Sequence, residues 1–376
     1  MIDLHQRPAT ERAAVVCDRL RDRPGVIVFL RGRGDDARAV LVAASGDLRA
    51  FAMKRLAGNG PRVDLAAVTD EVRASETGSG FEADWARWVL SSRLAPSEPG
   101  MRPSGGAFVS LEPAGDVPAC RVVGLVDRAG ADPGTLIGPF GRRSAADAFA
   151  RLLDDRFELC REPSLLARRP GAIACPYKEM GKCPAPCDGS EPMEAYRERV
   201  RAALEFAKRP VDIEVDSIRM AIEEATAALE FEWAASLKDE LAALGSVRGA
   251  AFAWATTLDR FGVLAVLPSG RSGWARLVVH RAGENHHLAD VDAGRAGEAI
   301  DACRDRLTAA CGPWTITPGA DESIGLVCRY LFAKRKTRST FLRLDPPPGR
   351  DAVLRAIRRA AKVDVDEPSE TTGAEP

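Results

Sequence analysis

The segment CPYKEMGKCPAPCDG, residues Cys175 to Gly189, contains three cysteines, and Cys160 precedes it. Together they give the spacing C-x14-C-x7-C-x3-C. Thiolates are soft ligands that suit zinc or an iron-sulfur cluster, and four of them can surround one ion or cluster if the chain between them loops back. We therefore predict a metal centre whose ligands are Cys160, Cys175, Cys183 and Cys187.

The spacing favours a 4Fe-4S cluster over zinc, because it lacks the C-x2-C knuckle that is the commoner zinc ligand spacing. The residues from Arg161 to Pro186 are rich in Arg, Pro and Gly and have no sustained apolar period. Such a loop needs an internal crosslink to become ordered. The alternatives are four buried free thiols or two disulfides, and disulfides are disfavoured because nothing near the N-terminus reads as a secretory signal.

Around these cysteines the sequence resembles the UvrC family of the excinuclease ABC system, the nuclease of bacterial nucleotide excision repair. The stretch GTLIGPFGRRSAADAFARLLDDRFELC before them is similar to the family's Gly-Pro-aromatic turn and following helix. The stretch ALEFEWAASLKDELAAL, Ala228 to Leu244, resembles the family's UVR motif. The resemblance covers about Arg23 to Val247 well, and it implies a 4Fe-4S cluster on the four cysteines, with zinc as the alternative.

Two amphipathic helices are expected around this motif, from Val215 to Leu229 and from Phe231 to Leu244, packed as an antiparallel hairpin. Residues 211–244 contain nine acidic and two basic residues, a net charge of -7. This charge favours a protein partner over direct contact with DNA. In the UvrC family the motif docks on the matching hairpin of UvrB, the damage-verifying helicase, so the resemblance implies UvrB as the partner.

By the same resemblance, the interface residues are Phe231, Ala234, Ala235, Leu237, Lys238 and Asp239. The alternative is an ordinary surface hairpin packed on its own domain, because short amphipathic helices are common.

The first 100 residues keep the strand and helix pattern of the family's GIY-YIG nuclease domain but not its catalytic residues. The alignment puts Ile27 and Leu41 at the two tyrosines and Phe51 at the catalytic arginine. It puts Arg87 at the metal-binding glutamate and Pro99 at the late asparagine. Because apolar side chains transfer no proton and a cation repels Mg²⁺, we assign no catalytic residue and expect a degenerate domain.

Two acidic residues in this domain, Glu82 and Asp84, offer a displaced metal pair as an alternative. They lie on a predicted helix that also carries Trp85 and Trp88. We expect both carboxylates to be solvated instead.

Basic residues in two places are candidates for DNA binding. Arg142 and Arg143 precede Ser144, the expected N-cap of a helix, where side chains and free amides can grip a phosphate. Residues 329–343 contain six basic and no acidic residues, with aromatic side chains between them. The candidates are Arg142, Arg143, Lys334, Arg335, Lys336 and Arg338. Solvated side chains are the alternative interpretation at both places.

Length and composition set the domain organisation. The chain has 376 residues, 45% of them hydrophobic, and a net charge of -1, so any contact with DNA must come from local patches. No apolar run approaches a membrane span, and we expect a cytoplasmic protein without a membrane partner. The expected parts are a degenerate GIY-YIG-like domain (1–100), linker strands with the Fe-S cysteine module (101–210), the UVR hairpin (211–246), a small C-terminal α/β domain (247–362) and a disordered acidic tail (363–376).

The predicted fold class is therefore α+β, and the predicted protein is a truncated, non-catalytic relative of UvrC. It is expected to bind UvrB, and DNA as a further partner, without cutting. Two alternatives come from other functional classes. One is an active DNA endonuclease with an unrecognised site in the C-terminal domain. The other is a UVR-motif adaptor of a chaperone or protease system.

Overall fold

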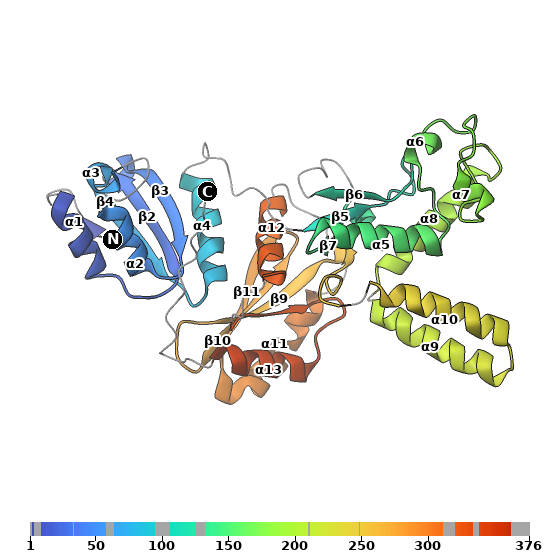
Figure 1. Ribbon diagram of the computed structural model, residues 1–376. Helices are drawn as coiled ribbons and strands as arrows, with labels where there is room; N and C mark the ends of the chain where they lie inside the picture. The colour runs from blue at the N-terminus through green and yellow to red at the C-terminus, as the bar shows by residue number, and fades with distance from the viewer. Residues whose placement is uncertain are drawn as a thin grey trace. The chain divides into compact units, whose positions relative to one another are not determined.

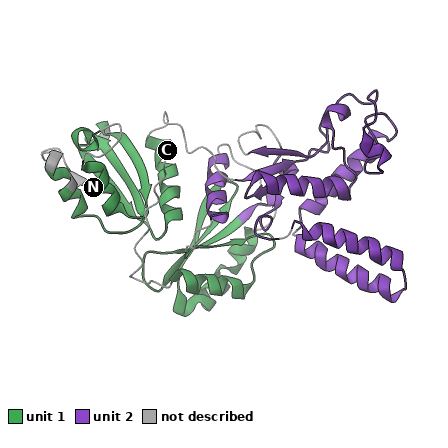
Figure 2. Cartoon of the chain, viewed as in Figure 1, with its two compact units in different colours: residues 1–102, 263–310, 334–376 green, residues 103–262, 311–333 purple. Residues whose placement is uncertain are grey.

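The computed structural model describes residues 2–3, 9–32, 34–57, 64–94, 106–124, 132–209, 211–247, 249–310, 320–333 and 338–361. Helices and sheets are mixed along the chain, as expected for an α+β fold (Figure 1). The chain divides into two compact units (Figure 2). Unit 1 contains residues 1–102, 263–310 and 334–376, and unit 2 contains residues 103–262 and 311–333. Within the described residues, no helix combines the length and apolar character that a membrane span requires.

Unit 1 begins with a four-stranded antiparallel sheet covered by helices on both faces. Its strands, in spatial order, are β1 (Ile2–Asp3), β4 (Glu71–Glu76), β2 (Gly25–Arg31) and β3 (Arg38–Ser45). Its helices are α1 (Ala9–Cys17), α2 (Leu48–Leu56), α3 (Leu65–Val68) and α4 (Gly80–Leu94). A short 3-10 helix, η1 (Gly34–Asp36), precedes β3.

The alternation of side chains along β2 explains the two layers. Ile27 and Phe29 join the core formed with α1, α2 and α3, whereas Val26 and Val28 join the core formed with α4. Successive residues of a strand point to opposite faces, so one apolar strand contributes to both cores.

The second sheet of unit 1 comes from the C-terminal part of the chain. Its strands, in spatial order, are β11 (Glu284–Asp292), β10 (Trp274–Arg281), β9 (Gly262–Pro268) and β12 (Thr340–Arg343). The helices α11 (Ala296–Ala309) and α13 (Arg350–Ala361) pack on it, and η5 (Ala293–Arg295) precedes α11. Helix α13 buries Val353, Ala356, Ile357 and Ala360 and exposes its charged face.

Unit 2 contains the third sheet, the cysteine segment and the helical hairpin. Its strands, in spatial order, are β6 (Arg121–Gly124), β5 (Ala107–Ser110), β7 (Leu136–Phe140) and β8 (Thr256–Thr257). Its helices are α5 (Arg143–Arg156), α6 (Pro163–Leu166), α7 (Pro176–Glu179), α8 (Met193–Ala207), α9 (Val211–Ala227), α10 (Phe231–Gly245) and α12 (Ala320–Leu331). The 3-10 helices η3 (Pro133–Thr135) and η4 (Leu258–Arg260) flank β7 and β8.

One apolar core runs through unit 2 from β5 to the hairpin. The Gly-Pro-aromatic turn at the end of β7 lies against the residue that follows α12: a Cβ on Gly141 would stand 2.7 Å from the ring of Phe332. Glycine is required here because any side chain would collide with that ring.

The structure differs from the sequence-based expectation in two places. Helix α5 begins at Arg143, not at Ala145, because the amides of Ala145 and Ala146 already donate to the carbonyl oxygen of Arg142. Ser144 is therefore inside the helix and the predicted N-cap is wrong. The expected C-terminal domain, 247–362, is also divided, since α12 belongs to unit 2 and the second sheet to unit 1.

Candidate metal centre and docking hairpin

The four candidate ligands lie on the irregular segment between α5 and α8 in unit 2. Cys160 follows the end of α5, Cys175 occupies the N-cap position of α7, and Cys183 and Cys187 lie on the turns after α7. Cys160, Cys183 and Cys187 are buried, and Cys175 is half-buried. The local chain is forced into a tight turn between the last two, since Ala185 has a φ of 62°.

The thiols interact with one another. The Cys160 thiol donates to the carbonyl oxygen of Glu162 at 3.5 Å. Interaction with Cys160 lowers the pKa of Cys183, and interaction with Cys183 together with burial raises the pKa of Cys160. Burial and the neighbouring Cys175 raise the pKa of Cys187. Cys187 is thus near enough to Cys160, Cys175 and Cys183 for the thiols to influence one another electrostatically.

Polar contacts hold Cys160 in place from helix α8. The hydroxyl of Tyr196, on α8, accepts a hydrogen bond from the amide of Cys160 at 3.2 Å and donates to the carbonyl oxygen of Pro118 at 2.7 Å. Arg199 donates to the carbonyl oxygens of Phe157 and Glu158 at 3.0 and 3.3 Å. These contacts fix the turn that leads from α5 into the cysteine segment.

The chemistry of these donors fits a thiophilic metal group. Among the residues that the structure describes, no three His, Cys, Asp or Glu side chains converge closely enough to hold a single ion. The ligands of a cluster surround several irons, so they need not converge as the ligands of one zinc ion must. The feature that supports a metal at this segment is therefore the chemistry of its donors, four cysteine thiols.

Sequence reasoning missed a buried thiol and carboxyl beside the candidate ligands. Cys120 lies beside Asp154, and burial raises the pKa of Asp154 to about 7. Asp154 is 8% exposed, and its Oδ1 atom has no hydrogen-bond partner among the described residues. A carboxylate within the apolar stripe of α5 was the signal available in the sequence, because such residues are rarely buried without a partner.

The hairpin α9–α10 forms as the two apolar stripes predict. Val215, Ile218 and Ala225 of α9 are buried, as are Leu237 and Leu244 of α10. Large apolar side chains also remain on its outside, which the stripes did not predict. Their exposed fractions are 51% for Ile213, 62% for Met220, 70% for Leu229, 65% for Phe231 and 55% for Trp233.

The structure separates the six candidate interface residues into two groups. Ala234 and Leu237 are each 4% exposed and pack inside the hairpin. The other four are exposed on α10: Phe231, Ala235, Lys238 and Asp239. A partner that meets the closed hairpin therefore contacts the second group.

The positions aligned with the nuclease residues lie in an apolar environment. Ile27 is fully buried, and Leu41 and Phe51 pack against the same core as Ile27. Arg87 is half-buried on α4, and Pro99 lies outside the described residues. The side chains of Ile27, Leu41 and Phe51 therefore belong to one apolar core.

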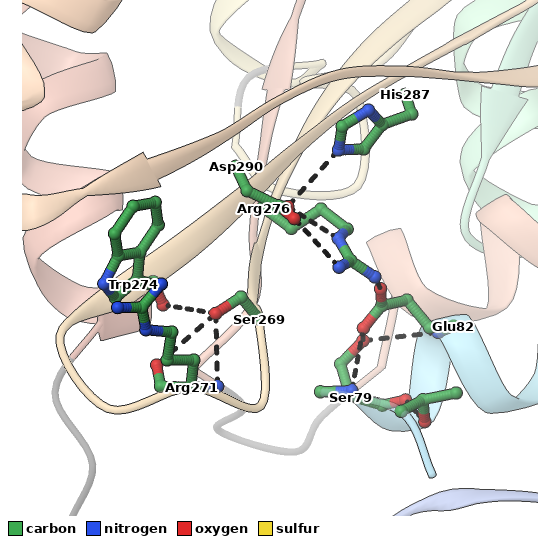
Figure 3. Close-up of polar contacts among 10 residues, drawn as sticks. Ser79, Glu82, Ser269, Arg271, Trp274, Arg276, His287 and Asp290 are labelled. Carbon is green, nitrogen blue, oxygen red and sulfur yellow. Dashed lines mark hydrogen bonds and ion pairs between the residues drawn. The ribbon is translucent and has the colours of Figure 1, made fainter. Parts of the chain in front are cut away.

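Glu82 is not solvated, contrary to the expectation, because it links α4 to the second sheet of unit 1 (Figure 3). Its Oε2 atom accepts from the amide of Gly78 and the hydroxyl of Ser79, both at 3.1 Å. Its Oε1 atom accepts from Arg276 at 2.7 Å. Arg276 also binds Asp290, which lies 3.3 Å from His287. The carboxylate of Glu82 therefore connects helix α4, which covers the first sheet, to strand β10 of the second sheet.

The DNA-binding candidates are only partly described. Arg142 and Arg143 are exposed at the start of α5, and Arg143 donates to the carbonyl oxygen of Val122 at 3.3 Å. Lys334, Arg335 and Lys336 lie outside the described residues, whereas Arg338 lies within them.

Comparison with known proteins supports the resemblance over the middle of the chain. Residues 114–206, which contain the cysteine segment, match the family described as UvrC/Cho excinuclease, middle domain. The match ends before α9, so it does not include the hairpin. No solved structure matched the chain significantly.

Similar curated proteins carry one name, UvrABC system protein C. That of Haloarcula marismortui is 30% identical over 234 residues, which are 60% of this chain and 38% of the relative. That of Desulforudis audaxviator is 31% identical over 244 residues, 60% of this chain and 36% of the relative. That of Thermus thermophilus is 33% identical over 120 residues, 32% of this chain and 20% of the relative. The chain thus resembles excision-repair proteins of the UvrC type and matches less than two fifths of the length of the first two relatives.

Proposed function

We propose that this chain is an excision-repair factor of the UvrC type that docks on UvrB through the α9–α10 hairpin and does not itself cut DNA. The similarity of residues 114–206 to the UvrC/Cho middle domain carries the proposal. That region leads directly into the hairpin, whose sequence resembles the UVR motif. The exposed arginines at the start of α5, Arg142 and Arg143, are the proposed DNA contacts.

The docking surface is the exposed face of α10. Phe231, Ala235 and Lys238 follow one another at i, i+4 and i+7, so they share one side of the helix, and Asp239 borders them. Phe231 supplies an aromatic anchor of the kind that dominates binding energy in interfaces. The net charge of -7 over residues 211–244 suits a partner surface that is basic around an apolar socket.

Cys160, Cys175, Cys183 and Cys187 would hold a 4Fe-4S cluster in this proposal, with zinc as the alternative. When bound, such a group crosslinks a segment with little apolar core of its own. Tyr196 holds the amide of Cys160, and Arg199 holds the carbonyl oxygen of Phe157 before it, with or without the group.

We propose that the N-terminal domain does not cut DNA because of the side chains at the positions aligned with the nuclease residues. Ile27, Leu41 and Phe51 present hydrocarbon where general acid–base and charge-stabilising groups are needed. Arg87 presents a cation where a divalent metal needs a carboxylate. Glu82, which precedes Arg87 on the same helix, is engaged by Arg276.

Binding to purified UvrB, measured by calorimetry, tests the docking proposal. Replacing Phe231 by Ala is expected to weaken binding by about 2 kcal/mol, or about thirtyfold, because a central aromatic anchor is lost. Met220→Ala is the matched control, since Met220 is equally exposed but lies on α9. No binding by the wild type, or equal losses in both variants, would contradict this surface.

Incision of a lesion-bearing duplex in the presence of UvrB tests the other half of the proposal. We expect no cleavage by this chain. Cleavage that persists in a highly purified preparation would refute the non-catalytic assignment.

A further inference from the structure

Arg156, at the end of α5, occupies an unusual position between the cysteine segment and the hairpin. Its guanidinium carbon lies 4.9 Å from the centre of the Phe206 ring and 5.7 Å from that of Phe157. Its side chain is 25% exposed. Two aromatic faces stabilise a cation in this way while restricting the directions it can point.

The same guanidinium pairs with both helices of the hairpin. It lies 4.0 Å from Glu214 of α9 and forms a close ion pair with Glu240 of α10. Arg209, between α8 and α9, pairs with Glu214 at 3.7 Å. Glu214 is 17% exposed and Glu240 is 30% exposed, so water screens these charges only in part. Without Arg156, two partly desolvated carboxylates of an already acidic hairpin would lose a shared cation.

The other side of Arg156 connects to the candidate metal ligands. Cys160 follows Arg156 by four residues, and the turn between them is fixed at each step. The amide of Leu159 donates to the carbonyl oxygen of Asp154 at 3.0 Å, Arg199 binds the carbonyl oxygens of Phe157 and Glu158, and Tyr196 binds the amide of Cys160. The backbone between Arg156 and Cys160 is therefore held by a continuous series of hydrogen bonds to α8 and to the end of α5.

We propose that Arg156 is the positioning residue through which the cysteine segment sets the orientation of the α9–α10 hairpin. Both helices of the hairpin are held by one side chain, and that side chain belongs to the helix that leads into the first candidate ligand. The importance of this orientation for partner binding rests on the proposed function. The coupling itself is a property of this chain alone.

Hydrogen–deuterium exchange on the full chain tests the coupling. Arg156→Gln is expected to raise exchange about tenfold in the first turns of α9 and the last turns of α10, near Glu214 and Glu240, because these turns lose their anchor. The amides around Leu229, at the far end of the hairpin, keep their rates. Arg151→Gln is the matched control, since Arg151 is exposed on the same helix. Unchanged rates in Arg156→Gln, or the same rise in Arg151→Gln, overturn the proposal.

Glu240→Gln provides a second route to the same measurement if Arg156→Gln fails to fold. It removes the pair from the side of the hairpin and leaves α5 intact. The same amides of α9 and α10 are expected to exchange faster, and unchanged rates count against the proposal.

Cys183→Ser tests the direction from the cysteine segment to the hairpin. It is expected to raise exchange at the anchored ends of α9 and α10 as well as around α6 and α7. A rise confined to α6 and α7 overturns the coupling. UvrB binding by Arg156→Gln is a separate readout: if the wild type fails to bind UvrB, the proposed function falls, while the exchange result still decides the role of Arg156.

Discussion

Glu82 and Arg276, which are 194 positions apart in the sequence, form an ion pair of 2.7 Å between the first turn of α4 and strand β10. Around it, Phe81 packs on Phe341 and Trp85 packs on His280, with ring centres 5.5 and 5.7 Å apart. One helix thus has two roles. Ala86 and Leu90 of α4 cover the first sheet of unit 1, and the aromatic side of α4 contacts the second.

Replacement of Glu82 by Ala is expected to lower the free energy of unfolding by about 1–2 kcal/mol. The substitution removes a capping interaction with Gly78 and Ser79 and leaves Arg276 with Asp290 alone. A double-mutant cycle with Arg276→Ala should give a coupling energy of about 0.5–1 kcal/mol, since Arg276 is 33% exposed.

Glu76→Ala serves as the control for this experiment. Glu76 lies 3.9 Å from Arg21, which is 72% exposed, so the change should stay within about 0.5 kcal/mol. Additive effects of the Glu82 and Arg276 substitutions would show that the observed pair contributes nothing to stability.

The contrast between Glu82 and its partner shows what the sequence can predict. The run Ser79 to Glu82 is a local capping pattern and can be recognised directly, but Arg276 is brought to it by tertiary structure alone. For the same reason, local periodicity predicted the two helices of the hairpin, although α9 ends at Ala227 and not at the expected Leu229, whose side chain is 70% exposed. Periodicity did not assign α12 to unit 2, because that assignment depends on contacts with residues far away in the sequence.

The candidate site was predictable to a similar extent. Cysteine spacing identified four thiols, of which Cys187 is an electrostatic neighbour of the other three. It gave no information on Cys120 and Asp154, whose proximity arises from packing between the residues before β6 and α5. The resemblance to the motif predicted Ala234 and Leu237 as interface residues. Both are buried instead, because apolar residues of a short hairpin pack between its own two helices.

His280 is expected to make the protein less stable in mild acid. It is 1% exposed on β10, its Nδ1 atom lies 3.0 Å from Oδ1 of Asn285, and burial lowers its pKa to about 4. The unfolded chain binds a proton at this side chain below about pH 6.5, whereas the folded chain does so below about pH 4. The free energy of unfolding should therefore fall by up to about 3 kcal/mol as the pH falls between these values.

Chemical denaturation of the wild type and of His280→Gln at pH 7.5, 6 and 5 measures this contribution. The variant lacks the titrating ring, so its stability should decline less over the range. Parallel pH profiles for the two proteins would mean that His280 takes up its proton at the same pH in the folded and the unfolded chain.

Asp154 should have the opposite dependence on pH. Burial raises its pKa to about 7, while the unfolded chain loses this proton near the ordinary value of 3.8. The folded state therefore loses stability as the pH rises from about 4 to about 7. Asp154→Asn stays neutral, so at pH 8 its free energy of unfolding should exceed that of the wild type by up to about 4 kcal/mol, and the difference should vanish near pH 4.

Asp155→Asn is the neighbouring control. Asp155 is 56% exposed and pairs with Arg161 at 2.6 Å, so its loss should be slightly destabilising at pH 8. Equal stability of Asp154→Asn and the wild type at pH 8 would show that the buried carboxyl ionises without cost.

Metal content distinguishes the ligand cysteines from the extra buried thiol. Cys183→Ser should lose most of the bound metal because it removes one of four proposed ligands, and Cys183 is the thiol with a lowered pKa. Cys120→Ser should retain it, although Cys120 also lies near Tyr196 and Asp154. Iron, zinc and acid-labile sulfide per chain, measured after anaerobic purification, provide the readout, and about four iron atoms with about four sulfides per chain would identify a 4Fe-4S cluster.

Limited proteolysis gives the structural consequence of metal loss. The segment from α6 to α7 contains Arg168 and Lys178 and has few buried side chains, so trypsin should cut it faster in Cys183→Ser than in the wild type or in Cys120→Ser. Cutting within α8, which is held by the apolar core of unit 2, should not change. Negligible metal in all three proteins, together with equal cutting, would show that the four thiols pack as ordinary core residues and bind no metal.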